Sequence, residues 1–389
     1  MSLGDPARLG RHAANVALVG GANLFQHKAR LIAAVSGIAV ALFLLLLQYE
    51  SLAAVRERVA ALYSFFNFDI ALVPDSYQIV VSPGTLSRVR LSQAKTLPEV
   101  RRTFGVNITI AAWLRQHKDG GQSALVIGID NDRDFIRDPE IRAGMDLLSN
   151  GASVLFDRLS QADIDPSHVG GIGSLGGTEL EIKGLFNLGL FFYAAGGIIV
   201  PTDLFTRLTG RDPHLVTLGL LQIAPGADVE KVKRELNAAL PHDVQILTRE
   251  ELIAQEQAYF VETKPIGIMM DIGMLIACLV AVTIMIQVLA TEIGNRMNEY
   301  AVLKAMGFSP SFVYGIGVTQ SAILAVAGLL PALAAAGAVF AFIHARTHLH
   351  AGIDLSLLVL ALGVALGTGL LAAAVVLWRI QRADPAELY

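Results

Sequence analysis

The chain has 389 residues, of which 53% are hydrophobic and only 16% charged, and its mean hydropathy of +0.54 is too high for an ordinary soluble protein. A net charge of −4, with no run rich in lysine and arginine, argues against a nucleic-acid-binding role. The single cysteine, Cys278, lies in an apolar run, so the chain forms no intramolecular disulfide.

Four apolar runs are long enough to cross a bilayer as helices, and they cover residues 31–49, 267–289, 312–342 and 355–377. The first run exceeds the apolar region of a signal peptide and follows about thirty residues, so we interpret it as a retained span. The third run is longer than a bilayer requires. This length predicts a tilt, a kink at Pro331, or a start below the membrane surface.

Lysine and arginine in the short flanks predict the orientation of the spans. Such residues lie before the first span, between the second and third, and after the fourth, whereas only Arg346 lies between the third and fourth. Residues 1–30, 290–310 and 378–389 are therefore predicted to be cytoplasmic, and residues 50–264 and 343–354 to lie outside. The protein is predicted to be a multi-pass membrane protein with both termini in the cytoplasm.

The long outer segment, residues 50–264, is predicted to be an α+β domain. Asp228 is placed to cap a helix over Val229–Leu240, and Thr248 with Glu251 forms a capping box that opens another helix leading straight into the second span. Residues 52–62 are also predicted to be helical, so the domain is expected to stand on two helical stalks. The predicted strands are 69–73, 78–81, 124–129, 154–156, 179–186, 197–200, 218–223 and 244–247.

A charged island, ATEIGNRMNEYAVLKAMGFSP, separates the second and third spans at residues 290–310. Its apolar residues recur with helical spacing, Gly307 suits a helix C-terminus, and Ser309-Pro310 suits the start of the next helix. The pattern predicts a small amphipathic helix at the bilayer surface. We interpret it as a coupling helix on which a separate cytosolic motor pushes; the alternative is a helix that only rests on the lipid.

Four stretches of the sequence resemble a known protein family. The similar stretches are NLFQHKARLIAAVSGIAVALFLLLLQ (residues 23–48), VLFDRLS (154–160), the island, and RIQRADPAEL (379–388). Together with the order of the elements, they are similar to the MacB/FtsX-type permeases of ABC exporters, and most of all to the DevC type. The glycine-rich residues 166–177 depart from that pattern.

The resemblance implies a homodimer in the bacterial inner membrane with an ABC ATPase below it. For DevC-like members it also implies a periplasmic adaptor (membrane fusion protein) and an outer-membrane channel of the TolC type. The sequence contains no G-x-x-x-x-G-K-[ST], so ATP hydrolysis is expected on a separate subunit and no cofactor is expected on this chain. Within the island, the residues that we expect to contact the ATPase are Glu299, Tyr300, Lys304 and Met306.

Four weaker signals remain open. Gly171–Gly176 satisfies G-x-G-x-x-G, but a strand-like run follows it, so we interpret it as a flexible loop. His344, His348 and His350 are interpreted as a polar interfacial loop in preference to a zinc site. Asp271, just inside the second span, is a possible intramembrane polar site. Gly363 and Gly367 form a G-x-x-x-G that is expected to pack against the chain's own spans in preference to a second copy.

The sequence leaves three alternative functions open. The first is an exporter permease that expels an amphiphilic cargo, glycolipid-like or otherwise hydrophobic. The second is an FtsX-like transmembrane regulator of a periplasmic cell-wall hydrolase. The third, a membrane-anchored enzyme, has no Ser/His/Asp spacing or paired carboxylates to support it, and no catalytic or metal residue is predicted.

Overall fold

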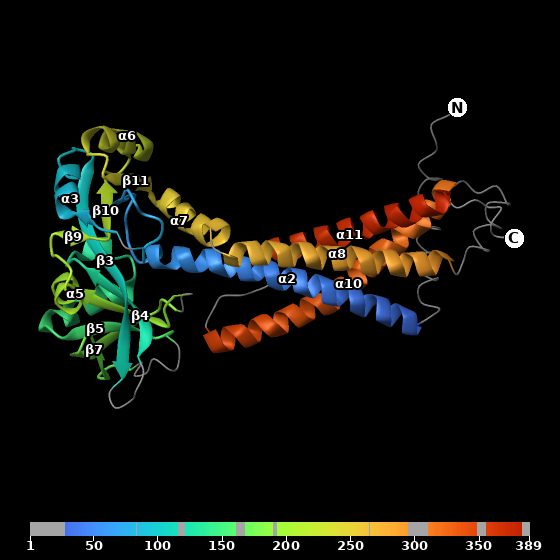
Figure 1. Ribbon diagram of the computed structural model, residues 1–389, viewed down its shortest axis with the longest axis horizontal. Helices are drawn as coiled ribbons and strands as arrows, with labels where there is room; N and C mark the ends of the chain where they lie inside the picture. The colour runs from blue at the N-terminus through green and yellow to red at the C-terminus, as the bar shows by residue number, and fades with distance from the viewer. Residues whose placement is uncertain are drawn as a thin grey trace. The chain divides into compact units, whose positions relative to one another are not determined.

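The computed structural model describes residues 28–82, 84–115, 121–160, 168–189, 193–263, 265–294, 310–347 and 355–382 (Figure 1). It divides into two compact units. The helical unit comprises Met1–Leu52, Ile268–Ile343 and Ala351–Tyr389, and the sheet unit comprises Ala53–Gly267 and His344–His350. The sheet unit is thus inserted between the first and second long helices.

The helical unit is built from long apolar helices. Four of them are long and apolar enough to cross a membrane, which confirms the predicted fold class of four spans with an α+β domain between the first and second. The helices are α2 (Lys28–Ser64), α8 (Pro265–Gly294), α10 (Pro310–Thr347) and α11 (Leu355–Arg382). Pro331 lies inside α10, and its missing N–H removes one bond from the helical ladder.

Small residues bring the helices of this unit close together. At Gly328 of α10 a β-carbon would lie 2.5 Å from Cγ2 of Ile38 on α2, and at Gly37 of α2 it would lie 3.1 Å from Cγ2 of Ile284 on α8. Gly369 of α11 faces the backbone of Ser321 on α10 in the same way, at 3.2 Å. No described atom lies within 4 Å of a β-carbon built on Gly363 or Gly367. The expectation that these two glycines pack against the chain's own spans is therefore wrong for the described residues.

The sheet unit contains one nine-stranded sheet, in the order β11-β1-β10-β3-β4-β8-β5-β7-β6, and a short pair β2-β9. The strands are β1 (Ile70–Pro74), β2 (Leu86–Ser87), β3 (Val100–Arg115), β4 (Gln122–Ile129), β5 (Ser153–Asp157), β6 (Ile172–Leu175), β7 (Thr178–Phe186), β8 (Gly196–Pro201), β9 (Leu215–Val216), β10 (Leu218–Ile223) and β11 (Val244–Thr248). The shorter helices are α3 (Arg88–Ala94), η1 (Arg133–Phe135), α4 (Pro139–Gly144), η2 (Met145–Asn150), α5 (Thr202–Thr209), α6 (Val229–Ala239), α7 (Arg249–Ala258) and η4 (Tyr259–Thr263).

The first half of this sheet is antiparallel and is covered on one face by α3 and α6. Leu91 of α3 and Val232 and Leu236 of α6 are buried against β1, β10 and β11. Asp228 accepts hydrogen bonds from the backbone N–H groups of Glu230 (3.0 Å) and Lys231 (3.3 Å), which confirms it as the N-cap of α6. The other face of this half packs against α7 and the end of α2, where Leu62 and Leu252 are buried.

The second half of the sheet closes on itself. The C-terminal end of β3 pairs with β6 as well as with β4, so β3, β4, β8, β5, β7 and β6 form a closed ring of strands. Trp113 of β3 is buried within this ring beside Phe156 of β5, with ring centroids 5.3 Å apart. A β-carbon on Gly173 of β6 would lie 2.1 Å from Cζ2 of Trp113. The glycine therefore leaves the space that the indole fills.

Three local predictions are wrong. Residues 171–176 do not form a flexible loop: β6 and β7 form a hairpin whose two turn residues, Gly176 (φ 59°) and Gly177 (φ 81°), take the left-handed conformation that such turns need. Residues 78–81 form turns because Val80 N–H donates to the Glu256 carboxylate and not to a neighbouring strand. The helix opened at Thr248 does not continue straight to the second span, since η4, a π-helix, follows α7 and Pro265 opens α8.

Candidate functional site

The residues predicted to contact an ATPase lie outside the described residues. Glu299, Tyr300, Lys304 and Met306 all fall in the segment 295–309, between the end of α8 at Gly294 and the start of α10 at Pro310. Pro310 is the first residue of α10, which agrees with its predicted position at N1. Their role stays a prediction.

Asp271 lies on α8 and is exposed in the helical unit. It shares the outward side of the helix with Ile268, Ile272 and Leu275, each more than half exposed. No cluster of three metal-binding side chains occurs in the described part of the chain, and His348 and His350 lie outside it. The functional role of Asp271 stays a prediction.

The sheet unit brings together a group of polar side chains that the sequence did not predict. We name it the stalk junction: the last turns of α2 from Arg56 to Ser64, helix α7, and the turns 75–82 that follow β1. Helix α7 begins at a complete capping box, as predicted, in which Glu251 N–H donates to Thr248 Oγ1 and Thr248 N–H donates to the Glu251 carboxylate. This start places Leu252 and Glu256, four residues apart, on the same buried side of α7.

Glu256 is the centre of the stalk junction. Its side chain is 2% exposed, and Oε1 accepts hydrogen bonds from the Tyr63 hydroxyl (2.6 Å), the Tyr77 hydroxyl and the Val80 N–H (2.6 Å). The two tyrosine oxygens also lie 3.0 Å apart. One carboxylate oxygen therefore joins three segments: α2 through Tyr63, the turns after β1 through Tyr77 and Val80, and its own helix α7.

Burial controls the electrostatics of this group. It raises the pKa of the Glu256 carboxyl to about 7, while the hydrogen bonds from Tyr63, Tyr77 and Val80 act in the opposite direction. Burial and the charge of Glu256 raise the pKa of the Tyr63 and Tyr77 hydroxyls well above their ordinary values. The pKa of Tyr193 is raised by the same two causes. The phenols therefore remain protonated donors, and Glu256 is the member that titrates near neutral pH.

Further hydrogen bonds hold the end of α2 against α7. Arg249 of α7 donates to the carbonyl oxygens of Tyr63 (3.0 Å) and Phe66 (3.3 Å), and its guanidinium lies 5.2 Å from the centre of the Phe68 ring. Gln257 donates to the carbonyl oxygen of Arg56 at 2.9 Å. Arg249 thus supplies one donor to a carbonyl group in the last turn of α2, at Tyr63, and one to the carbonyl group of Phe66, just beyond the helix.

The opposite side of α2 is bound to the ring of strands. Arg58, which is 8% exposed, donates to the carbonyl oxygen of Leu188 at 2.8 Å. The same loop is held by Asp157, whose carboxylate accepts from the N–H groups of Leu188 (2.9 Å) and Gly189 (2.8 Å). Gly189 has φ 86°, and a β-carbon there would lie 2.4 Å from Nη1 of Arg58. The end of α2 is therefore bound to both halves of the sheet.

The stalk junction is a buried hydrogen-bond network that joins three segments of the sheet unit. Its polar groups are buried and bonded to one another, with the hydroxyls of Tyr63 and Tyr77 both donating to the Glu256 carboxylate. A sequence signal was available: Glu256 follows Leu252 by four residues on the apolar side of a helix, where a carboxylate needs partners. The identity of those partners, Tyr63 and Tyr77, was not readable because they are almost 180 or more residues away.

The C-terminal part of the chain matches a known protein family. Residues 272–385 match the family described as FtsX-like permease C-terminal. This segment includes α10, α11 and most of α8, together with the residues 290–310. None of the curated proteins compared with the chain matches it.

Among solved structures, the chain is similar to the periplasmic region of MacB from Actinobacillus actinomycetemcomitans, with 9% identity, a TM-score of 0.34, and coverage of 49% of this chain and 92% of that one. It is also similar to the extracellular domain of the noncanonic ABC-type transporter YknZ from Gram-positive bacteria, with 14% identity, a TM-score of 0.32, and coverage of 46% and 98%. A domain of a putative permease protein from Porphyromonas gingivalis gives 10% identity, a TM-score of 0.31, and coverage of 46% and 86%. Residues 272–385 are therefore similar to the family described as FtsX-like permease C-terminal.

Proposed function

We propose that this chain is the permease subunit of an ABC exporter of the DevC type, which transmits ATP-driven motion from a separate ATPase to its outer domain. The observation that carries the proposal is the FtsX-like permease match over residues 272–385, in a chain whose sequence contains no phosphate-binding P-loop. ATP binding and hydrolysis then belong to the partner subunit, and this chain performs no covalent chemistry.

In this mechanism the ATPase pushes on residues 290–310, with Glu299, Tyr300, Lys304 and Met306 as contacts. The motion passes along α8 into η4 and α7. Support for this route comes from the stalk junction, where Glu256, Arg249 and Gln257 bind α7 to the end of α2. A displacement of α7 must either move α2 and the sheet with it or break buried hydrogen bonds, and leaving buried polar groups unpaired costs about 1–3 kcal/mol each.

The proposed assembly is a homodimer in the bacterial inner membrane with both termini in the cytoplasm, an ABC ATPase on the cytoplasmic side, and a periplasmic adaptor leading to a TolC-type outer-membrane channel. The proposed cargo is amphiphilic, glycolipid-like or otherwise hydrophobic. The residues 50–264 then lie in the periplasm, where the outer domains open and close to drive the cargo outward.

The test is co-purification from gently solubilised membranes through a tag on this chain. An ABC ATPase is expected with the wild type and is expected to be lost from the double variant Tyr300→Asp, Lys304→Glu, because these changes alter the charge of the proposed contact surface. A double variant on the sheet unit, Arg234→Gln, Glu179→Gln, serves as the matched control and is expected to retain the ATPase.

The co-purified proteins also separate the two transmembrane functions. An adaptor in the eluate supports export, whereas a cell-wall hydrolase supports the FtsX-like regulator. If the wild type brings down no ATPase, the permease proposal fails, and the outer domain must be assayed as a receptor or an enzyme.

A further inference from the structure

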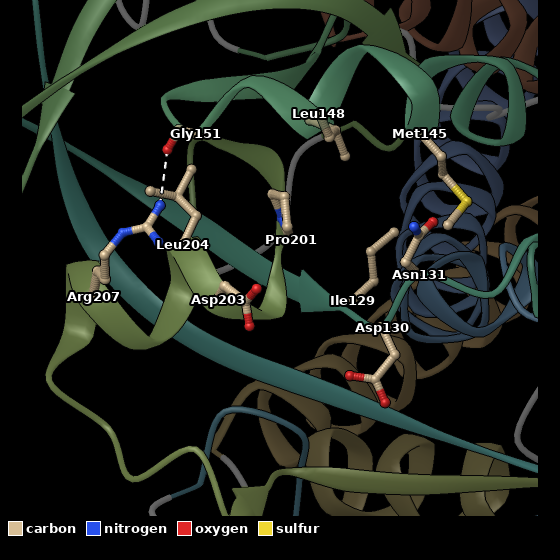
Figure 2. A pocket seen from close by; sticks show the side chains of 10 residues that line it. All are labelled: Ile129, Asp130, Asn131, Met145, Leu148, Gly151, Pro201, Asp203, Leu204 and Arg207. Carbon is tan, nitrogen blue, oxygen red and sulfur yellow. Dashed lines mark hydrogen bonds between the residues drawn. The ribbon is translucent and has the colours of Figure 1, made fainter.

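A pocket in the sheet unit lies away from the stalk junction (Figure 2). Its volume is about 300 Å³, which is at the lower end of the range for sites that hold a small molecule. Strands β4 and β8 are parallel neighbours that end together, with Ile129 opposite Pro201. The pocket opens outside these two carboxyl ends, the place where parallel strands commonly present ligand sites.

Both apolar and polar residues line the pocket. The apolar side chains that line it are Ile129, Leu204, and Met145 and Leu148 of η2 (Figure 2). These four side chains are all buried, at 3–7% exposed, so the walls are set by the core and do not depend on surface side chains. An apolar group that enters the pocket removes further apolar surface from water.

The charged groups at the rim differ in how much of their bonding capacity is used. Asp130 is fully engaged, because its carboxylate accepts from Arg88 through two bonds of 2.8 Å, from Thr202 Oγ1 and from Gly105 N–H. It is a structural part of the wall. Asp203 is different: it is exposed, and its side chain makes no hydrogen bond or salt bridge within the described part of the chain.

Arg207 completes the rim. It lies one helical turn after Asp203 on α5, and Figure 2 shows both on the same side of the pocket. One nitrogen of its guanidinium donates to the Gly151 carbonyl oxygen at 2.9 Å, and no salt bridge is found for it among the described residues. The other N–H groups of the fork remain available for a ligand. The rim therefore offers one carboxylate and one guanidinium beside an apolar pocket.

We propose that this pocket binds a small zwitterion with apolar substituents, with its ammonium group at Asp203, its carboxylate at Arg207 and an apolar side chain against Met145 and Leu148. The spacing of the two charges fits this class. The β-carbons of two residues four positions apart on a helix are separated by about 6 Å. The ammonium and carboxylate groups of an extended dipeptide are separated by roughly 7 Å. This site does not depend on the proposed transport function.

The probe is leucyl-leucine, and the measurement is saturation-transfer NMR on the full-length chain in nanodiscs of phosphatidylcholine. Three analogues each remove one feature: N-acetyl-leucyl-leucine lacks the ammonium, leucyl-leucine amide lacks the carboxylate, and glycyl-glycine lacks the apolar side chains. Leucyl-leucine is expected to show saturable binding. The N-acetyl and amide analogues are each expected to bind at least about fivefold more weakly, the effect of one lost charged contact of about 1 kcal/mol. Glycyl-glycine is also expected to bind more weakly, because it buries no apolar side chain in the pocket.

Charge-neutral variants give a crossed pattern that non-specific binding cannot produce. Asp203→Asn is expected to bind leucyl-leucine and its N-acetyl analogue equally, while it still prefers leucyl-leucine to the amide. Arg207→Gln is expected to bind leucyl-leucine and the amide equally, while it still prefers leucyl-leucine to the N-acetyl analogue. Asp75→Asn and Arg234→Gln, exposed positions elsewhere on the sheet unit, are matched controls that keep both preferences. Two results with the wild type alone would overturn the proposal: equal binding of all four probes, or no saturable binding of leucyl-leucine. The proposal would also be overturned if Asp203→Asn and Arg207→Gln kept both preferences, as the control variants are expected to do.

Discussion

At the scale of single residues, burial brings the pKa of the Glu256 carboxyl close to neutral pH. Its surroundings contain three phenols, those of Tyr63, Tyr77 and Tyr193, whose pKa values are all raised, and one backbone donor from Val80. No cationic side chain is among the causes that shift its pKa. The carboxylate is therefore stabilised by neutral donors alone, which do not fully offset its loss of hydration.

This leads to a pH dependence of stability. The pKa of Glu256 is raised from an ordinary value of 4.5 to about 7 in the folded state, so the folded chain binds this proton more tightly than the unfolded chain. The stabilisation is fully present below pH 4.5 and is lost as the pH rises through 7, by about 3 kcal/mol in total. Urea unfolding of the full-length protein, followed by Trp113 fluorescence in a Trp378→Phe background, measures this directly.

In the same assay, Glu256→Gln is expected to flatten the dependence between pH 5 and pH 8, because the amide does not titrate. Glu179→Gln, an exposed position, is the control and is expected to retain the slope of the wild type. Identical slopes for wild type and Glu256→Gln would show that another group is responsible.

At the scale of elements, the close contacts between the long helices depend on particular glycines. Gly328→Ala places a methyl group 2.5 Å from Cγ2 of Ile38, so α10 must move away from α2. Overpacking of this kind typically costs about 1–3 kcal/mol. Gly363→Ala meets no described atom within 4 Å and replaces a glycine in the middle of α11, where alanine is favoured by up to about 1 kcal/mol.

Thermal unfolding in one detergent, followed by circular dichroism, is therefore expected to give a lower midpoint for Gly328→Ala and an equal or higher midpoint for Gly363→Ala. The pair is matched because both changes add the same methyl group to a long apolar helix. A drop in the midpoint for Gly363→Ala would mean that its open side is covered by another molecule in the detergent-solubilised protein.

At the scale of the whole molecule, the stalk junction makes a prediction about coupling. The double variant Arg249→Ala, Gln257→Ala removes the donors that bind α7 to the carbonyl groups of Tyr63, Phe66 and Arg56, while the capping box and the Glu256 contacts remain. The chain is expected to fold and to co-purify with its ATPase as the wild type does.

The transmitted response, in contrast, is expected to fall. In the reconstituted complex, ATP is expected to change hydrogen exchange in the β-strands of the wild-type sheet unit. This change is expected to drop at least about fivefold in the double variant, since each of the hydrogen bonds removed is worth about 1 kcal/mol. Lys231→Ala, on the exposed side of α6, serves as the control. An undiminished response in the double variant would exclude this contact as the route of motion.

The local elements that the sequence predicted correctly have signals within a few residues. The four long apolar runs, the Asp228 cap and the Thr248–Glu251 capping box each depend on length, composition or a spacing of three residues. Strand β3, the longest in the sheet, was not predicted, although Phe104, Val106, Ile108 and Ile110 alternate along it. The hairpin of β6 and β7 was also missed, although Gly176-Gly177 is a turn signal.

The sequence by itself determined that the chain has four apolar helices with a mixed α and β domain after the first, because hydropathy and length act locally. The resemblance to the MacB/FtsX-type permeases was also read from the sequence, and the match of residues 272–385 to the FtsX-like permease C-terminal family agrees with it. The tertiary structure alone decided the ring closed by β3 and β6 and the contacts of Glu256 with Tyr63 and Tyr77. These features join residues far apart in the chain, and their partners are fixed by packing and not by any local pattern.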